Sequence, residues 1–347
     1  MKRKAVNQLK EGDILAKEVA TSGGLVLIPQ GTSMKKQYTD RLKDLGIQYV
    51  YIEEVSSKES PVEKPTENEE EKIKSQCQTT VKETMDKFSY LGNTELSRIK
   101  DVAEEIILDI LEEPEIMYSV SGIRNKGDQV YAHCLNVCAL SVLMALKMKL
   151  PNKKVREIAV GSLLHDIGYI YVPGDLLYRE IEEMDTEQRS ELKKHVVYGF
   201  EAMKEESWLS ATARNIILYH HERLDGSGYP FRWKEERIKT EVRIVTICDA
   251  FDRWVYGFFC EPMKVHKALE RITSESEKAF DFEIVKIFLE SVAAFPNGTH
   301  VIINDGREAK VLRQNPKCPT RPVLQILPDG EELDLTKELN IVISDTI

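Results

Sequence analysis

The amino-acid sequence predicts a mainly α-helical protein, with a small α/β module before the helical part and a small β appendix after it. Three observations lead to this fold class. Apolar residues recur at helical spacing between about 76 and 294, short strand-like runs alternate with turns over 1–55, and strand-like runs return over 295–347. The length of 347 residues is sufficient for two or three compact domains.

The N-terminal module is predicted from two strand-like runs, 25–32 and 48–55, and from a helical pattern over 34–47. No catalytic group of residues lies in this module, so we expect a regulatory or docking role for it. Residues 56–75 contain six acids, four bases and two prolines. A segment of this composition buries too little apolar surface to fold alone, which predicts a charged linker.

The helical domain is predicted from a series of amphipathic or apolar segments joined by short connections. These segments are 95–113, 130–150, 153–168, 190–206, 210–221, 241–254 and 282–295. In the appendix, residues 299–315 read as a hairpin around Asp305-Gly306, and 321–327 and 338–344 read as further strands.

Composition narrows the classes of function. The net charge of −10 argues against a general nucleic-acid binder, which would need a basic face. The N-terminus lacks the apolar run of a signal peptide, and the longest apolar stretch, 137–146, is too short to cross a bilayer. None of the six cysteines forms a CxxC pair, and Cys134 and Cys138 are interpreted as buried thiols, with metal ligation as the alternative. We therefore expect a reduced, cytoplasmic protein without a membrane segment.

Several titratable residues lie in places where packing alone explains them poorly. Asp249 lies in an apolar run and is costly to bury unless it forms a salt bridge, for instance with Arg243 or Arg223, or binds a metal. His133 is compatible with a hydrogen-bonded core histidine. The pair His165-Asp166 is compatible with a helix cap. The doublet His220-His221 at a helix end is harder to assign to packing.

Taken together, these residues favour a metal centre. The five histidines of the helical domain's motifs, with two aspartates, supply the nitrogen and oxygen ligands that Zn, Mn, Fe or Ni prefer; the residues are His133, His165, Asp166, His195, His220, His221 and Asp249. They exceed the needs of one ion, and an aspartate can bridge two. Two ions about 3.5–4 Å apart suit hydrolysis at phosphorus, because they generate hydroxide near neutral pH.

The run His-His-Glu-Arg-Leu-Asp-Gly-Ser-Gly-Tyr-Pro over 220–230 resembles the HHExxDGxGYP signature of the HD-GYP family. The resemblance covers about 125–292 and includes the His165-Asp166 pair and Asp249 with Asp252. It also includes an HxxNV element from His133 to Val137, with Asn136, and an HxxxG element from His195 to Gly199. It implies an HD-type helical bundle. It also implies a bacterial phosphodiesterase that hydrolyses cyclic di-GMP to pGpG and GMP with iron or manganese.

The resemblance further implies a ligand set for each of two ions. One ion would be held by His133, His165, Asp166 and Asp249. The other would be held by His195, His220 and His221, with Asp166 as the bridging, catalytic carboxylate. Three-metal members carry a Glu where this chain has Gln129, so two ions are expected.

The signature loop is expected to lie beside the site, either as a structural turn or as a docking surface. Its residues are Arg223, Asp225, Gly226, Gly228, Tyr229 and Pro230. Its glycines permit the backbone conformations that a tight turn needs.

The chain departs from the family pattern at positions that would contact substrate phosphate. Tyr169 stands where a Lys is usual, and Phe258 and Glu261 stand where basic residues are usual. Arg253 or Lys264 would have to compensate from a shifted position. Each lost charge-assisted contact costs about 1.5–3 kcal/mol.

Three functions follow. The first is hydrolysis of a cyclic dinucleotide, the second is binding of a cyclic dinucleotide or a protein partner without turnover, and the third is hydrolysis of another nucleotide. A protein partner would dock on the Gly-Tyr-Pro loop or on residues 1–55, and a homodimer is compatible with the sequence.

Overall fold

The computed structural model describes residues 2–6, 9–10, 12–17, 19–20, 26–28, 32–35, 38–39, 42, 49–52, 98–112, 129–315 and 318–347. The predicted linker over 56–75 lies outside these residues. The chain divides into two compact units, 1–113 and 114–347, which are described separately.

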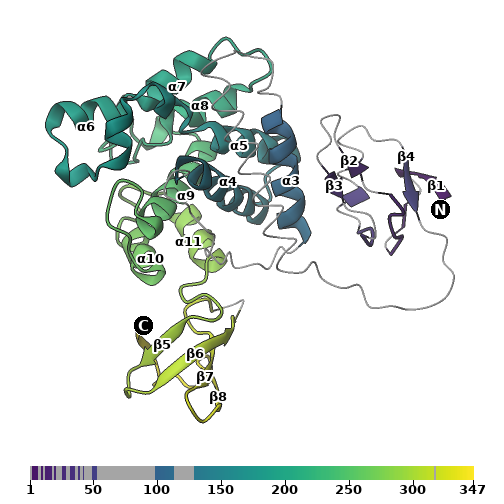
Figure 1. Cartoon of the computed structure of the whole chain (residues 1–347), viewed down its shortest axis with the longest axis vertical. Helices are drawn as coiled ribbons and strands as arrows, with labels where there is room; N and C mark the ends of the chain where they lie inside the picture. Colours follow the sequence, from purple (N-terminus) through teal and green to yellow (C-terminus); the bar gives the residue numbers. More distant parts are fainter. Residues whose placement is uncertain are drawn as a thin grey trace. The chain divides into compact units, whose positions relative to one another are not determined.

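The first unit contains two small antiparallel pairs of strands (Figure 1). Strand β1 (Lys2–Ala5) pairs with β4 (Tyr49–Ile52), and β2 (Val19–Ala20) pairs with β3 (Val26–Ile28). Exposed and buried residues alternate along β4, which is the period of two that a half-buried strand shows. Of the helix predicted over 34–47, Tyr38, Thr39 and Leu42 are helical and the rest lies largely outside the described residues.

Helix α3 (Arg98–Glu112) belongs to this first unit, whereas its sequence pattern predicts a place in the helical domain that begins at about 76. Leu108 on α3 explains the difference, because it is buried in one cluster with Leu15 and Ile28 of the N-terminal module. The amphipathic pattern of 95–113 correctly predicted a helix. It could not indicate which core would cover the apolar face.

The second unit is mainly helical, in agreement with the predicted fold class. Its helices are α4 (Gln129–Lys147), α5 (Asn152–Leu164), α6 (Thr186–Lys193), α7 (His195–Met203), α8 (Ala211–Tyr219), α9 (Thr240–Tyr256), α10 (Val265–Ser274) and α11 (Phe282–Ser291). Short 3₁₀ turns η2 (Ile167–Tyr171), η3 (Gly174–Tyr178), η4 (Ile181–Glu183) and η5 (Glu235–Arg237) connect them. Helix α4 packs between α5 and α9, and α8 packs on α5 (Figure 1).

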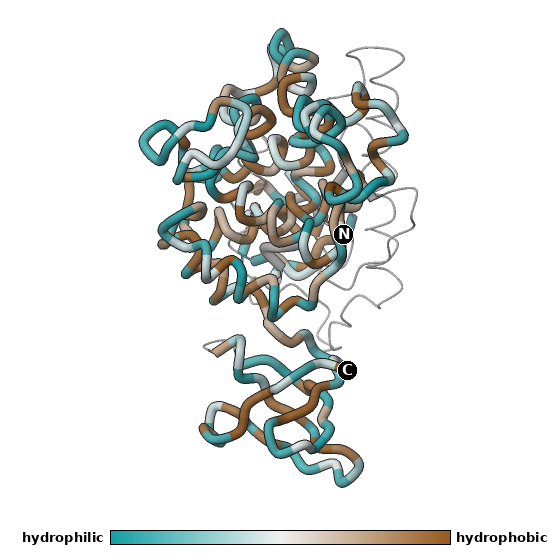
Figure 2. Tube along the Cα trace, turned by 90° about the vertical axis from the view of Figure 1, so that its left-hand side faces the viewer, coloured by the Kyte–Doolittle hydropathy of each residue, from teal (hydrophilic) through white to brown (hydrophobic). Residues whose placement is uncertain are grey.

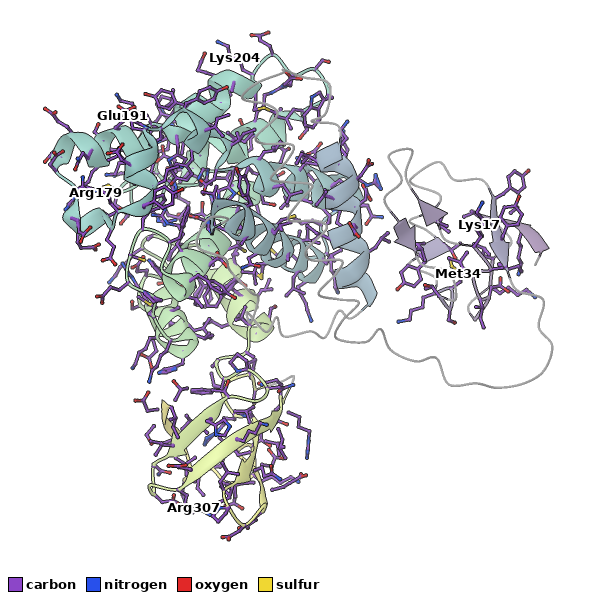
Figure 3. All side chains as sticks on the ribbon, viewed as in Figure 1. Lys17, Met34, Arg179, Glu191, Lys204 and Arg307 are labelled. Carbon is purple, nitrogen blue, oxygen red and sulfur yellow. The ribbon has the colours of Figure 1, made fainter. Side chains whose placement is uncertain are left out.

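Helix α4 forms the centre of this bundle. Its window Val130–Lys147 is long and apolar enough to cross a membrane by composition, but 67% of it is buried inside the protein. Figure 2 shows hydrophobic residues gathered inside the helical part and hydrophilic ones on its turns. Charged side chains such as Glu191 and Lys204 project from the surface (Figure 3). The apolar face of α4 is therefore accounted for by packing of helices.

The predicted helix over 190–206 is two helices, α6 and α7, which meet at Lys194. Asp185 begins α6 with a capping box to Gln188, which fixes the start of this segment. The break at Lys194 makes His195 the first residue of α7. This arrangement leaves His195 Nδ1 beside a main-chain carbonyl of the preceding helix.

The C-terminal residues form a five-stranded antiparallel sheet in the order β8-β7-β6-β5-β9. The strands are β5 (His300–Ile303), β6 (Glu308–Arg313), β7 (Val323–Ile326), β8 (Glu332–Asp334) and β9 (Ile343–Thr346). The predicted hairpin over 299–315 is confirmed by the β5–β6 pair. Strand β8 was not predicted, and the strand predicted over 338–344 overlaps only the start of β9.

Candidate metal centre

Three histidine rings are oriented by carbonyl groups of the turn that precedes each of them. The Nδ1 atoms of His165, His195 and His220 lie 2.6 Å from the Ser162 carbonyl, 2.7 Å from the Leu192 carbonyl and 3.0 Å from the Ile216 carbonyl. A carbonyl oxygen only accepts hydrogen bonds, so each Nδ1 donates a proton. Each Nε2 is thereby left free to act as a ligand.

These Nε2 atoms converge on the carboxylate of Asp166, which is 2% exposed. Its Oδ1 lies 3.3 Å from His195 Nε2 and 3.5 Å from His220 Nε2. Its Oδ2 lies 3.3 Å from His165 Nε2 and 3.5 Å from His133 Nε2. Each oxygen of Asp166 thus faces a different pair of imidazoles.

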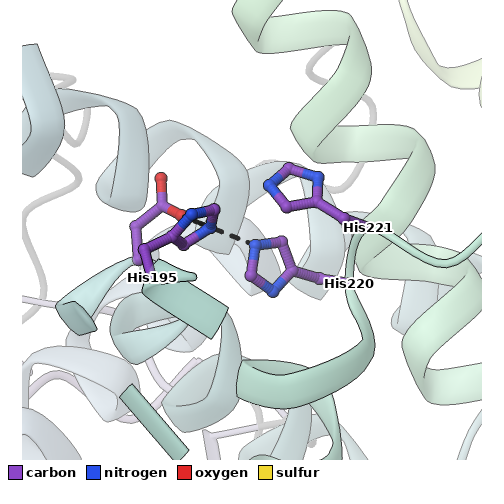
Figure 4. Close-up of side chains that lie close together, drawn as sticks. His195, His220 and His221 are labelled. Carbon is purple, nitrogen blue, oxygen red and sulfur yellow. Dashed lines mark ion pairs between the residues drawn. The ribbon is translucent and has the colours of Figure 1, made fainter. Parts of the chain in front are cut away.

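The ligand atoms form two groups that share Asp166. The first group is His133, His165 and Asp166, and the second is Asp166, His195, His220 and His221. Within each group the candidate ligand atoms lie within 4.8 Å of one another. Figure 4 shows the rings of His195, His220 and His221 brought together from two different segments. The structure therefore gathers all five histidines that the sequence analysis selected.

Asp249, on α9, lies between the two groups. Its Oδ1 is 3.1 Å from His133 Nε2 and its Oδ2 is 3.3 Å from His221 Nδ1. The alternative of a salt bridge from Asp249 to Arg243 or Arg223 is wrong. Arg243 binds Asp281 at 2.8 Å, and the Arg223 guanidinium lies over the Phe280 ring. Asp249 is fully buried and belongs to the histidine cluster.

Burial and the neighbouring carboxylates shift the pKa values of three histidines in the centre. Burial alone would lower the pKa of His133, but hydrogen bonds to Asp249 and Asp252 outweigh it and raise that pKa to about 9. Burial likewise opposes protonation of His165, yet Asp166 raises its pKa to about 9. Burial dominates at His220 and lowers its pKa to about 4. His220 is therefore neutral at pH 7, as a metal ligand must be.

The donor atoms fit divalent ions. Asp166 Oδ1, His195 Nε2, His220 Nε2 and Asp249 Oδ2 are buried without a hydrogen-bond partner among the described residues, although buried polar atoms rarely lack one. Two ligands that each lie about 2.1 Å from one ion are about 3.0–3.4 Å apart at angles of about 90–110°. The separations around Asp166 are close to this range. The mixture of imidazole and carboxylate suits Fe, Mn or Zn.

The signature loop is fastened to the centre by Glu222, which the sequence analysis did not select. The Glu222 carboxylate accepts hydrogen bonds from the backbone N–H groups of Phe231 at 2.7 Å and Trp233 at 3.0 Å. Because Glu222 follows His221 directly, these bonds tie the loop to a candidate ligand. An acid that follows two buried histidines was the available sequence signal.

The other loop residues occupy distinct positions. A side chain at Gly228 would overlap the carbonyl oxygen of His221, so the loop approaches the centre more closely than other residues permit. The Tyr229 ring centroid lies 4.7 Å from that of His221. Gly226 has a φ of +79°, and Asp225 is exposed and accepts from Ser227 N at 2.9 Å. Arg223 and Pro230 are half-buried, and the Arg223 guanidinium lies 4.8 Å from the Phe280 ring.

Two of the departures from the family pattern are aromatic rings packed on candidate ligands. Tyr169 stacks on His195 at a centroid distance of 4.1 Å, and Phe258 lies 4.9 Å from the His133 ring. Both side chains are almost fully buried in one apolar cluster with Phe259. The third departure, Glu261, is exposed. Where phosphate-binding cations were expected, the structure therefore has an apolar wall and a surface acid.

Asp252 and Asn136 belong to the sequence motifs of the resemblance, but no role at the site was predicted for either residue. Asp252 accepts from His133 Nδ1 at 2.6 Å, and the Asn136 amide donates to its other oxygen at 3.0 Å. Asp252 follows Asp249 by three residues, so both lie on one face of α9. This spacing was the signal that could have indicated a supporting role. Cys134, Cys138 and Cys248 are buried free thiols, and neither group of candidate ligands includes them.

The chain is similar to known proteins over the residues that build this centre. A family model described as an HD domain matches residues 113–284, and one described as a KOW domain associated with HD domain matches residues 300–347. The cyclic di-GMP phosphodiesterase PA4108 of Pseudomonas aeruginosa is 29% identical over 227 residues, which are 65% of this chain and 54% of that protein.

A 3'3'-cGAMP-specific phosphodiesterase of Vibrio cholerae is 26% identical over 189 residues, which are 53% of this chain and 36% of that protein. The chain thus spans about half the length of these relatives, or less. Among solved structures, an HDG"Y"P protein from Bdellovibrio bacteriovorus has 20% sequence identity and a TM-score of 0.44, over 82% of this chain and 97% of that one. The HD-domain match, the curated relatives and the signature at 220–230 lead to one conclusion: the chain belongs to the HD-GYP family of HD-domain proteins.

Proposed function

We propose that this chain is a metal-dependent phosphodiesterase that hydrolyses cyclic di-GMP, or a related cyclic dinucleotide, to pGpG and GMP. The observation that carries the proposal is the position of Asp166, whose two oxygens face two different pairs of histidines. A carboxylate in this position can bridge two ions. The names of the curated relatives, which act on cyclic di-GMP and cGAMP, support the substrate class.

In this proposal the two groups of ligands hold iron or manganese. His133, His165, Asp166 and Asp249 hold one ion, and His195, His220 and His221 hold the other, with Asp166 as the shared catalytic carboxylate. When bound, the two ions supply a hydroxide near neutral pH and stabilise charge on the attacking and leaving oxygens.

The protein's own residues orient these ligands and exclude water. The carbonyl groups of Ser162, Leu192 and Ile216 hold the Nδ1 protons of three histidines, which directs each Nε2 toward Asp166. Asp252 does the same for His133. The rings of Tyr169 and Phe258 cover one side of the centre and lower its dielectric constant.

One observation favours a second candidate function, a module that binds a cyclic dinucleotide with little or no turnover. Tyr169 and Phe258 place apolar rings where cations would contact phosphate. Loss of those contacts weakens binding of the transition state without removing a metal ligand. In that case a protein partner would bind the Gly-Tyr-Pro loop or residues 1–55. We propose that residues 1–55 are a regulatory module and that the protein is cytoplasmic.

The full chain, loaded without oxygen with Fe²⁺ or Mn²⁺, tests the proposal against cyclic di-GMP, cGAMP and cyclic di-AMP. Chromatography should detect linear dinucleotide from at least one substrate, and chelation should abolish it. His220→Gln should be inactive, whereas His300→Gln, an exposed histidine of β5, should match the wild type. Calorimetric binding without turnover, in protein that holds both ions, would contradict the proposal and favour the second candidate.

A further inference from the structure

Arg253, on α9, places a guanidinium group beside the candidate metal ligands. Arg253 follows Asp249 by four residues, so the two side chains leave the same face of the helix. Its guanidinium nitrogen Nη1 lies 3.3 Å from His221 Nε2. A permanent positive charge therefore stands directly beside the candidate metal centre.

We infer that Arg253 is the residue that binds substrate phosphate in this chain, by donating hydrogen bonds from its guanidinium to the non-bridging oxygens of a phosphodiester at the centre. The inference rests on the proposed function, because it requires a phosphate ester beside the ligands. It assigns to Arg253 a role in binding and positioning, and no bond to Arg253 forms or breaks.

The guanidinium of Arg253 has N–H groups available to donate further hydrogen bonds. Within the part of the chain that the structure describes, Arg253 has no carboxylate within ion-pair distance, and its side-chain contact is His221 Nε2. Burial alone would lower the pKa of Arg253, but Asp249, Tyr169, Tyr229 and Asp166 together outweigh burial and raise it. A guanidinium carries five N–H donors, and a phosphodiester offers several acceptor oxygens in a matching plane.

The other positions considered for a phosphate-binding cation do not supply one. Tyr169 and Phe258 are buried aromatic rings, and Glu261 is an exposed acid. Lys264 binds Asp345 Oδ1 and the Thr346 carbonyl oxygen, each at 2.7 Å. Arg253 is thus the residue that can replace the charge missing at 169 and 258, from a different place in the sequence.

The charges of the loaded centre also favour an anion beside Arg253. Three aspartates (166, 249 and 252) offset three of the four positive charges that two divalent ions would bring, and the ligating histidines would be neutral. Arg253 adds a further positive charge. A cation beside bound ions is repelled unless an anion lies between them, and the negatively charged phosphate of a substrate meets this need.

Calorimetric titration of inorganic phosphate into the full chain loaded with Mn²⁺ tests the inference directly. Arg253→Gln should weaken phosphate affinity by about 10- to 100-fold, because charge-assisted hydrogen bonds are lost. Arg253→Lys should be intermediate, because an ammonium keeps the charge but not the planar pair of donors. Lys264→Gln, which removes the same charge from the rival position, should match the wild type. Manganese content and melting temperature should be the same in all four proteins.

Four results would overturn the inference. Three of them are phosphate affinity unchanged in Arg253→Gln, an equal loss in Lys264→Gln, and loss of manganese from Arg253→Gln, which would make Arg253 a support of the ligands. Failure of manganese-loaded wild type to bind phosphate would also overturn it. A wild type that hydrolyses no cyclic dinucleotide, but loses phosphate binding selectively in Arg253→Gln, would defeat the proposed reaction and leave the role of Arg253 standing.

Discussion

The Nδ1 atom of His133 lies 2.6 Å from Oδ2 of Asp252, a residue 119 positions away, and Asn136 donates to the other oxygen of the same carboxylate. This bond fixes the ring of His133 with Nε2 directed at Asp249 and Asp166. Supporting hydrogen bonds of this kind typically change metal affinity by about 10- to 100-fold.

We therefore expect Asp252→Asn to lower the affinity for one of two manganese ions by about 10- to 100-fold, because one of the two hydrogen bonds is lost. Competition with a chelator measures this affinity. Asp329→Asn, an exposed carboxylate of the C-terminal sheet, is the control and should bind both ions normally. Equal affinities in the two variants would refute a supporting role for Asp252.

Asp166 and Asp249 are expected to differ in how many ions depend on them. Asp166→Asn should reduce the metal content from two ions to one or none and abolish turnover, because both groups of ligands share this carboxylate. Asp249→Asn should retain the ion held by His195, His220 and His221. Metal analysis of the purified variants distinguishes them. Two ions retained in Asp166→Asn would exclude the bridging role.

Stability of the metal-free protein should depend on pH. The pKa values of His133 and His165 are raised to about 9 in the folded protein from 6.5, so protonation stabilises the metal-free fold. This contribution is complete below about pH 6.5 and is lost as pH rises toward 9. The chelated protein should therefore melt at a lower temperature at pH 9 than at pH 6.5.

The metal-loaded protein serves as the control for this measurement. Bound ions take the place of the protons, and metal binding becomes more favourable as the histidines lose them. The loaded protein should show a smaller decrease in melting temperature over the same interval. The same decrease in both forms would mean that these histidines are not the groups responsible.

Alanine substitutions at Gly168 and Gly174 test the close packing beside the centre, with Gly174 as the control. A Cβ at Gly168 would overlap the backbone carbonyl of His195, whereas a Cβ at Gly174 meets no atom within 4 Å. Overpacking typically costs about 1–3 kcal/mol, and a rigid backbone contact should lie at or above the top of that range. Urea denaturation should show a loss of about 3 kcal/mol or more for Gly168→Ala and little change for Gly174→Ala. Similar values for the two would contradict this packing.

Glu222 should stabilise the signature loop more than Asp225 does. Glu222→Gln removes the charge and one of two acceptor oxygens that hold Phe231 and Trp233, which should cost about 1–3 kcal/mol. Asp225→Asn affects an exposed carboxylate with one bond to Ser227 and should cost less than about 1 kcal/mol. Denaturant titration measures the free energy of unfolding of both variants. A larger loss in Asp225→Asn than in Glu222→Gln would show that Glu222 is not the main residue that holds the loop.

Local patterns in the sequence were sufficient for the fold class and for most helices of the second unit. The apolar repeat over 241–254 predicted α9, and the turn at Asp305-Gly306 predicted the β5–β6 hairpin. The break at Lys194 was missed, because apolar residues keep helical spacing through it. Helix α10 was not predicted either, although its residues are strongly amphipathic.

The residue types available for chemistry could be predicted from the sequence alone, since imidazoles, carboxylates and the 220–230 signature are read directly from the chain. Three relationships become visible only in the folded chain. Asp166 lies between two pairs of histidines, Asp252 supports His133, and Arg253 rather than Lys264 lies beside the centre. The physical reason is distance along the chain. Helix periodicity and capping act within a few residues, whereas these contacts join helices whose relative placement depends on packing of the whole core.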